Sequence, residues 1–400
     1  MAESSNGLDF GLKKPRPRSV YVHVPFCRHR CGYCNFSLVA GRDYLVDRFL
    51  IALGQEIESL PESFEVDTVY LGGGTPTHLS DQQLAELFAH LRKRFSWPET
   101  AEVTIEANPV DLQRDRSTVF REFGINRVSL GAQSFNPSKL AVLERDHDAE
   151  QIRKAVEESR KFATSVSIDM IFATPKETLT EWVQDLENLE TLSIEHVSTY
   201  ELTYEKRTRF WARRLKGEQV ESDEELRLQM YETTMERLQK FGFAQYEISS
   251  FARLDRRSRH NQVYWSGLDY WAFGPGASGY VAGMRYTNVG SLLRYLKLME
   301  MNSTPRELEE RLSPAESARE LLAIGLRNLD GPSESEFHSR TGMSFKDCAG
   351  HAIERLTNWG LLEFSEPRLR LTNRGKLLYD TVAVEILAEK VAGKTTQRDI

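Results

Sequence analysis

Cysteine is scarce in this chain, with only four residues among 400. Three of them cluster near the N-terminus and Cys348 stands apart, so a disulfide framework is excluded and a reducing compartment is expected. The chain also lacks an excess of positive charge, because its formal net charge is −7, and this disfavours a general nucleic-acid-binding protein. No apolar run approaches the roughly 18 residues that a transmembrane helix needs.

The N-terminal segment lacks the apolar core of a secretory signal. Residues 1–18 are polar, with Lys13, Lys14, Arg16 and Arg18 around two prolines. We therefore expect a disordered N-terminal tail over residues 1–18 and a cytoplasmic protein.

Short β-rich runs alternate with longer amphipathic stretches in the first half of the chain. Strands are predicted at Ser19–Val24, Asp67–Leu71, Glu102–Glu106, Arg127–Leu130, Ser165–Phe172 and His196–Leu202. Helices are predicted, from apolar residues at helical spacing, at Tyr44–Leu60, Asp81–Phe95, Glu150–Phe162 and Thr180–Leu192. This alternation indicates parallel βαβ units. The expected fold class is α/β, with residues 19–205 forming a (β/α)6-type partial TIM barrel.

The pattern changes after the predicted barrel. Residues 206–312 are expected to form an extension with a long charged helix, Asp223–Phe241, followed by a loop rich in aromatic residues and glycine. From Ser313 the sequence predicts three helices, a hairpin of Leu361–Phe364 and Leu369–Leu371, and a final helix from Arg374. Helices followed by a two-stranded wing are typical of a winged-helix module. We predict a C-terminal helical, winged-helix-like domain over residues 313–400, used for packing or partner docking because the chain is acidic.

The clustered cysteines, Cys27, Cys31 and Cys34, have the spacing CxxxCxxC at the end of a predicted strand. Three thiolates hold three irons of a cubane [4Fe–4S] cluster and leave the fourth iron open to another ligand. Zinc is the alternative, but structural zinc takes four ligands and this motif offers three. The spacing therefore favours a [4Fe–4S] cluster with one open iron.

Polar or glycine residues also follow the later strands, and the carboxyl ends of parallel barrel strands gather at one face. Gly72–Thr75 follows the second strand, and its glycines let a ligand approach the backbone closely. Glu106 ends the third strand, where a carboxylate can accept both hydroxyls of a ribose; an ion pair with a neighbouring Lys or Arg is the alternative. Gln133, Arg145 and Asp169 follow or lie in the next two strands. Singly, each is more often a satisfied surface or core group, but together they predict one ligand pocket.

These motifs resemble the radical S-adenosylmethionine superfamily and, within it, the oxygen-independent coproporphyrinogen III oxidase-like branch. The resemblance covers residues 19–286 and is carried by HVPFC, the cysteine spacing, GGGTPT, the Glu106 strand, LGAQSF and FGPG. It implies that the three cysteines bind the cluster and that S-adenosyl-L-methionine (SAM) chelates the open iron. It further implies SAM contacts from Tyr21, Gly73, Gly74, Thr75, Glu106, Gln133, Arg145 and Asp169.

A further motif distinguishes two groups of this branch. The residues His260–Trp265 match the HNxxYW signature of HemW-like heme chaperones, whereas Phe36 stands where the dehydrogenases have another cysteine. An imidazole can ligate heme iron, and aromatic faces can stack on a porphyrin. We therefore predict heme binding by His260, Tyr264 and Trp265, with the arginines of residues 253–259 holding the propionates. A structural histidine and a solvated charged loop are the alternatives.

The resemblance implies a heme chaperone that binds heme and transfers it to an acceptor protein, such as a respiratory enzyme. A donor such as flavodoxin would reduce the cluster. Whether the protein is an enzyme stays open, and no residue is assigned a catalytic role.

An oxygen-independent coproporphyrinogen III dehydrogenase, which decarboxylates propionates through a 5′-deoxyadenosyl radical, is the alternative. A structural Fe–S or electron-transfer protein is the third hypothesis, and it would need a fourth cluster ligand.

Overall fold

The computed structural model describes residues 16–389, so most of the predicted N-terminal tail lies outside it. All six predicted strands are present, as β1 (Ser19–Val24), β5 (Thr68–Gly73), β7 (Glu102–Ala107), β8 (Arg127–Gln133), β9 (Ser165–Phe172) and β10 (His196–Glu201). They form one nine-stranded sheet with β13 (Trp271–Phe273) beside β1, and with β12 (Ser250–Ala252) and β11 (Ala244–Glu247) beyond β10. In their order across the sheet, the strands β13, β1, β5, β7, β8, β9 and β10 run parallel to one another. Strand β12 is antiparallel to both of its neighbours, β10 and β11.

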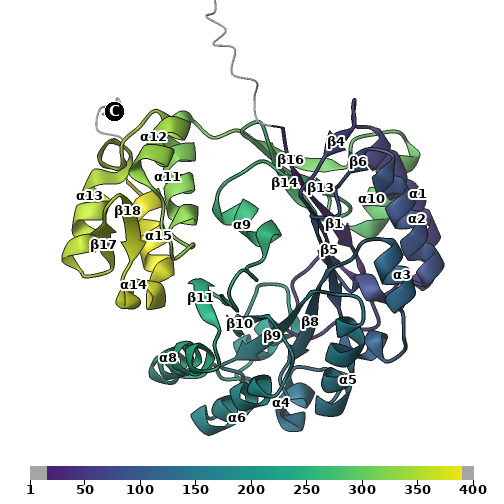
Figure 1. The fold of residues 1–400 in the computed structure, drawn as a ribbon, viewed down its shortest axis with the longest axis horizontal. Coiled ribbons are helices and arrows are strands. Elements are labelled where there is room, and N and C mark those ends of the chain that lie inside the picture. The colour runs from purple at the N-terminus through teal and green to yellow at the C-terminus, as the bar shows by residue number, and fades with distance from the viewer. Residues whose placement is uncertain (1–15, 390–400) are drawn as a thin grey trace, which may run out of the picture.

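The end strands β11 and β13 do not pair with each other, so the sheet forms an open barrel (Figure 1). This confirms the predicted α/β partial TIM barrel. Small two-stranded pairs, β2 (Phe26–Cys27) with β3 (Val39–Ala40) and β4 (Phe64–Glu65) with β6 (Phe95–Ser96), lie outside the main sheet.

Helices cover the outer face of the barrel. They are α1 (Val46–Glu58), α2 (Asp81–Arg92), α3 (Ser117–Glu122), α4 (Pro137–Val142), α5 (Ala149–Arg160) and α6 (Leu179–Glu190). Ser80, Asp148 and Thr178 begin α2, α5 and α6 with reciprocal capping boxes, which satisfy backbone amides at each helix start. The apolar faces of these helices and the outward side chains of the strands form the main hydrophobic core. The short helices α3 and α4 were not predicted, because six residues carry too little periodicity.

The region after β10 contains α7 (Arg209–Leu215), the predicted long helix α8 (Glu224–Lys240), α9 (Arg259–Trp265) and α10 (Leu292–Glu300). A three-stranded sheet of β14 (Ser278–Val281), β15 (Met284–Asn288) and β16 (Arg306–Glu310) follows β13. Helix α9 occupies part of the predicted aromatic loop and lies in the middle of the molecule (Figure 1). Glu102 of β7 accepts hydrogen bonds from the amides of Arg259 and His260, so the start of α9 is fixed to the sheet.

The C-terminal region has a hydrophobic core of its own. It contains α11 (Pro314–Gly325), α12 (Glu334–Thr341), α13 (Phe345–Asn358), the hairpin of β17 (Leu362–Ser365) and β18 (Arg368–Leu371), α14 (Asn373–Leu377) and α15 (Tyr379–Leu387). The predicted three helices and hairpin are found, but the predicted final helix is divided because Leu378 has non-helical backbone angles. The domain boundaries remain predictions.

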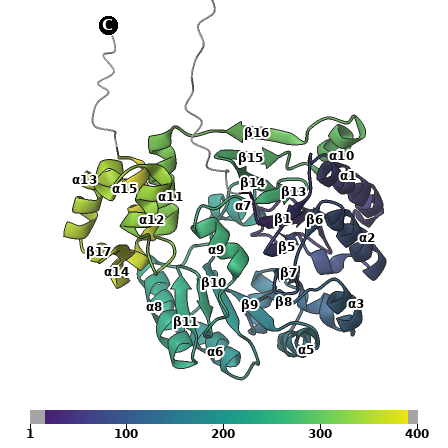
Figure 2. The same cartoon turned by 45° about the horizontal axis from the view of Figure 1, so that its top comes forward.

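Polar contacts join the C-terminal helices to the barrel. Arg327 pairs with the buried Glu247 at 3.1 Å, and the amide of Leu329 donates to the Tyr246 carbonyl. Arg340 donates to the carbonyl of Ser266, just beyond α9. Figure 2 shows the C-terminal helices beside α8 and α9. Within residues 16–389, no helix combines the length and apolar character that crossing a membrane would require.

Candidate functional site

The three clustered cysteines open into one cavity of about 1110 Å³ at the carboxyl ends of the barrel strands. Cys34 closes a turn in this loop, its amide donating to the Cys31 carbonyl at 3.2 Å. Thr75 Oγ1 lies 3.3 Å from Cys27 Sγ, and Arg145 Nη1 lies 3.6 Å from Cys31 Sγ. Side chains from two other segments of the chain therefore lie beside the sulfur atoms.

The sulfur arrangement fits a polynuclear cluster. Among residues 16–389, no three His, Cys, Asp or Glu side chains converge on one point as ligands of a single metal ion do. The thiolates of a cubane bind different iron atoms, so this kind of cluster does not need such convergence. Cys27, Cys31 and Cys34 line one cavity, and their donor set suits a cubane, which would keep one iron without a cysteine ligand.

The glycine turn after β5 is fixed to the cysteine loop. The amide of Gly74 donates to the Val24 carbonyl at 2.8 Å, and that of Thr75 donates to the Phe26 carbonyl at 2.8 Å. Gly73 has a φ of 105°, and a Cβ atom there would lie 2.4 Å from the His23 ring. This position therefore requires glycine, and the turn forms a close-fitting backbone wall beside the cysteines.

Glu106 lies at the end of β7 with its carboxylate held from two sides. Tyr70 donates its hydroxyl to Oε1 at 2.9 Å, and the Gly73 amide donates to Oε2 at 2.9 Å. Burial, together with the nearby charge of Asp169, raises the pKa of Glu106 to about 7. The carboxylate still has lone pairs available to a ligand in the cavity.

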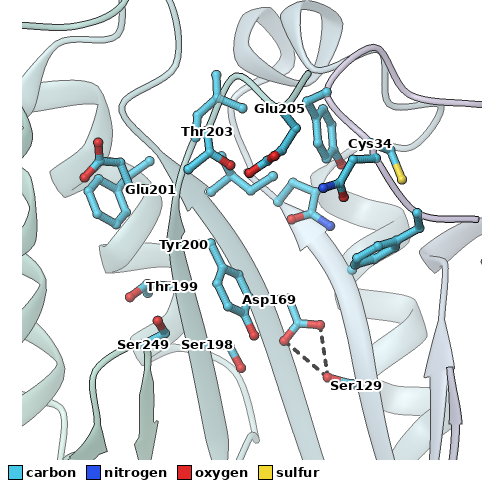
Figure 3. A pocket seen from close by; sticks show the side chains of 18 of the residues that line it. Cys34, Ser129, Asp169, Ser198, Thr199, Tyr200, Glu201, Thr203, Glu205 and Ser249 are labelled. Atoms are coloured by element: carbon cyan, nitrogen blue, oxygen red, sulfur yellow. Dashed lines mark hydrogen bonds between the residues drawn. The ribbon is translucent and has the colours of Figure 1, made fainter. Parts of the chain in front are cut away.

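Three further predicted contacts line the same cavity. The Ser129 hydroxyl donates to the Asp169 carboxylate, with its oxygen 3.0 and 3.2 Å from the two carboxylate oxygens (Figure 3), and burial raises the pKa of Asp169. Gln133 has a φ of 67° where the register of β8 and β9 shifts, which turns the end of β8 out of the regular ladder. Arg145 donates to the Gly131 carbonyl at 2.8 Å, while its buried Nε has no partner in the described structure.

The structure thus brings together seven of the eight predicted SAM contacts. Tyr21 is the exception, because it does not line the cavity and its hydroxyl lies 3.1 Å from His23 Nδ1. Sequence reasoning missed Tyr70, Ser198 and Tyr200, which also line the cavity. The alternation of inward and outward side chains along each strand was the available signal, since Tyr70 shares a face with Gly72.

His260 does not fit the predicted role of heme ligand. Its side chain is 0% exposed, and its ring stacks on Tyr70 with centroids 5.0 Å apart. The Thr68 hydroxyl donates its hydrogen to Ser19, so at the 2.7 Å contact with His260 it must accept, and Nδ1 of His260 donates. The other ring nitrogen, Nε2, then accepts from the Tyr264 hydroxyl at 2.7 Å. Burial lowers the pKa of His260 to about 3, so the ring is neutral. The structural role that was the alternative is favoured, because both nitrogens are occupied inside the protein.

The other predicted heme residues are also engaged within the protein. Tyr264 bonds His260, and the Trp265 ring lies under the Arg327 guanidinium at 4.5 Å. In the basic run, Arg253 donates to backbone carbonyls of Ile194 and Phe241, Arg257 pairs with Asp330, and Arg259 donates to the Thr100 carbonyl. The cavity is not lined by Tyr264, by Trp265 or by any of these three arginines. The geometry favours a structural role for these five side chains, whereas Ser258 and Asn261 of the same segment line the cavity.

The cavity extends beyond the predicted SAM contacts to the C-terminal helices. Its outer part is lined by apolar or aromatic side chains of β9, α8, α14 and α15, of the residue after β10 and of the residue between α14 and α15; they include Phe172, Leu202, Leu228, Tyr231, Leu377, Leu378 and Tyr379. Basic side chains line it as well, among them Arg227, Arg374 and Lys376. The whole cavity is larger than the roughly 300–1,000 Å³ of ordinary small-molecule sites. It therefore has room for a second ligand beside SAM.

Comparisons with known proteins agree with this site. Residues 21–189 match the radical SAM superfamily, and residues 312–378 match the HemN C-terminal domain. The heme chaperone HemW of Bacillus subtilis is 34% identical over 377 residues, covering 93% of this chain and 100% of that protein. Radical S-adenosyl methionine domain-containing protein 1, mitochondrial, of Danio rerio is 31% identical over 386 residues, covering 93% and 87%.

A solved structure has the same fold. The coproporphyrinogen III oxidase HemN of Escherichia coli, a radical SAM enzyme, superimposes with a TM-score of 0.82 at 24% identity, covering 93% of this chain and 90% of that one. At this identity the match concerns the fold alone. The sequence identity to the HemW proteins over nearly the whole chain, together with the cysteine loop and the cavity beside it, shows that this chain belongs to the HemW family of the radical SAM superfamily.

Proposed function

We propose that the protein is a heme chaperone whose heme delivery is governed by a [4Fe–4S] cluster and SAM. Cys27, Cys31 and Cys34 would hold the cluster. The observation that carries the proposal is that these cysteines and seven of the predicted SAM contacts line one cavity. The relatives named heme chaperone HemW support heme as the cargo.

The residues of the inner cavity would bind and orient SAM. The backbone wall at Gly73 and Gly74 suits the amino-acid end of SAM, beside the open iron. The Glu106 carboxylate, held by Tyr70 and the Gly73 amide, would accept the ribose hydroxyls. Arg145, whose buried Nε has no partner in the described structure, supplies positive charge beside the cluster. When bound and reduced, the cluster supplies the electron that cleaves the SAM sulfonium.

Heme would occupy the outer part of the cavity. Leu228 of α8 is 40% exposed, and Leu378, which lies between α14 and α15, is 38% exposed, so two separate segments offer apolar surface to a porphyrin face. Arg374 and Lys376 line the same space, and their charges suit the two propionates. From there an acceptor protein, such as a respiratory enzyme, would take the heme.

Anaerobic reconstitution tests this proposal. We expect about four irons and four sulfides per chain, an electron paramagnetic resonance (EPR) spectrum of the reduced cluster that changes when SAM is added, and a Soret band that shifts on heme binding. The variant Cys31→Ala should lose the cluster spectrum, whereas the buried Cys348→Ala, far along the chain, should retain it. A cluster spectrum that ignores SAM would refute the proposal.

The alternative function gives a different result with the same reconstituted protein. Conversion of coproporphyrinogen III into protoporphyrinogen, with consumption of SAM, would identify a dehydrogenase. We expect heme to bind and no such turnover.

A further inference from the structure

The chain has a strongly basic segment beside the cysteine loop that the proposed SAM and heme sites do not use. Between residues 206 and 216 it carries six Lys or Arg and no Asp or Glu, although the formal net charge of the protein is −7. Helix α7 occupies most of this segment. A local excess of one charge in a protein of opposite net charge is typical of a surface that steers a charged partner.

Helix α7 is attached directly to the cysteine loop. The amide of Phe210 donates to the Gly32 carbonyl at 3.0 Å, and a Cβ atom on Gly32 would lie 2.6 Å from the Phe210 ring. Arg209 donates to the Arg30 carbonyl. Gly32 lies between Cys31 and Cys34, so a protein seated on α7 covers the outside of the loop that would hold the cluster.

Several cations of this surface are free to meet a partner. Arg209 and Arg213 share Glu144, at 2.5 and 3.1 Å, and Arg214 pairs with Glu221 at 2.8 Å. In the described structure, the exposed side chains of the three remaining cations of this segment lie within 4.0 Å of no carboxylate; they are Lys206, Arg207 and Lys216. Arg30 of the cysteine loop has no carboxylate partner there either, and its guanidinium donates to the Phe36 carbonyl. We call these four residues the basic patch. Phe36, two residues after Cys34, is 55% exposed and adds apolar area beside the loop.

We propose that the basic patch is the docking surface for a small acidic protein that delivers one electron to the cluster. The inference rests on the proposed function, because only a redox-active cluster needs such a donor. The electron would come from a carrier such as an anionic flavin hydroquinone. On losing one electron the hydroquinone becomes the neutral semiquinone, and the cluster passes from the 2+ to the 1+ state. No proton is exchanged. An acidic partner fits because its carboxylates would pair with the four cations of the basic patch, which have no carboxylate partner in the described structure. Docking here brings its flavin close to the loop, which matters because electron tunnelling slows steeply with distance.

Charge reversal tests the docking surface on the reconstituted full-length protein. In the double variant Lys206→Glu with Lys216→Glu, reduction of the cluster by flavodoxin hydroquinone at low salt should slow by about tenfold, and the difference should shrink at high salt. The matched control is Lys154→Glu with Lys240→Glu, two exposed lysines of α5 and α8, which should reduce at the wild-type rate. Reduction by dithionite, a small reagent that needs no docking, should be equal in all three proteins.

The outcomes separate this inference from the proposed function. Equal flavodoxin-dependent rates in the patch variant and the wild type would overturn the docking surface, as would an equal loss in the control variant. Slower heme transfer to an acceptor with normal reduction by flavodoxin would also overturn it, because the patch would then serve the acceptor. Failure of dithionite to produce a SAM-responsive EPR spectrum in the wild type would instead refute the proposed function.

Discussion

At the scale of single residues, the site depends on carboxylates held at the ends of barrel strands. Glu106 is the clearest case, because its two oxygens are fixed by Tyr70 and the Gly73 amide before any ligand arrives. Such preorganisation means that a ligand need not order the carboxylate on binding. The same burial that fixes the group also moves its pKa into the neutral range.

SAM binding should therefore depend on pH through Glu106. With a pKa raised to about 7, the carboxyl is protonated below this pH and accepts the ribose hydroxyls poorly. It ionises above pH 7, so SAM affinity should increase as pH rises through 7 and fall by up to about tenfold per pH unit below it. Calorimetric titration of SAM from pH 6 to pH 8 would measure this trend.

The variant Glu106→Gln is the control for this titration, because an amide does not ionise. Its affinity for SAM should be weaker than that of the wild type at pH 8 and flat across the range. An unchanged pH dependence in this variant would assign the titration to another group, such as Asp169.

At the scale of elements, α9 shows how a helix on the cavity side of the sheet can support the site. His260 packs on Tyr70, and Tyr70 donates to Glu106. The start of α9 is held by Glu102 of β7, so the helix braces two neighbouring strands. We infer that His260 positions the Glu106 carboxylate, the group proposed to bind SAM.

Removal of the His260 ring should therefore weaken SAM binding and leave heme binding intact. His260→Ala would leave a cavity and unpaired hydroxyls on Thr68 and Tyr264, and should lower the free energy of unfolding by about 2–4 kcal/mol. The SAM-induced change in the EPR spectrum should require more SAM, while heme affinity and the Soret position stay unchanged. The exposed His351 provides the control variant His351→Ala, which should match the wild type in all three measurements. A lost or shifted Soret band in His260→Ala alone would restore the heme-ligand hypothesis.

The elements also show what sequence patterns can reveal. The six strands were predictable because each contains β-branched or aromatic residues and all but His196–Leu202 are soon followed by glycine or proline. The four longer helices were predictable because their apolar periodicity spans several turns. The position of α9 was not predictable, since a seven-residue helix has little periodicity and its contacts are with residues about 160 to 190 positions away. For the same reason, HNxxYW looked like a heme site from local chemistry alone.

At the scale of the whole molecule, the cavity is built from both regions of the chain. The cysteine loop, the strand ends and α14–α15 all line it, although residues 27 and 379 are far apart in sequence. No local motif marks Arg374 or Lys376 as cavity residues, and only the docking of the C-terminal helices places them there. The inner half of the site was therefore predictable and the outer half was not.

Charge reversal in the outer cavity should reduce heme affinity selectively. In Arg374→Glu with Lys376→Glu, the two proposed contacts to propionates would be replaced by repulsion. We expect heme affinity to fall at least about tenfold, because a charged hydrogen bond contributes about 1.5 kcal/mol or more. The SAM response of the EPR spectrum should stay unchanged. Heme titration followed by absorbance would measure the effect.

The matched control is Arg311→Glu with Lys346→Glu, two exposed cations that do not line the cavity. Its heme affinity should equal that of the wild type. Equal affinity in both double variants would place the propionates elsewhere.

The unpaired end strands of the main sheet have one more consequence. A ring of eight strands closed by hydrogen bonds has a fixed bore, which its own side chains fill. Here β11 and β13 are not paired, so hydrogen bonds between strands do not fix the width of the barrel, and residues of the C-terminal helices line the cavity together with the strand ends. The size of the cavity therefore depends on how the two regions of the chain pack together, and a single substitution in the lining should weaken ligand binding without closing the cavity.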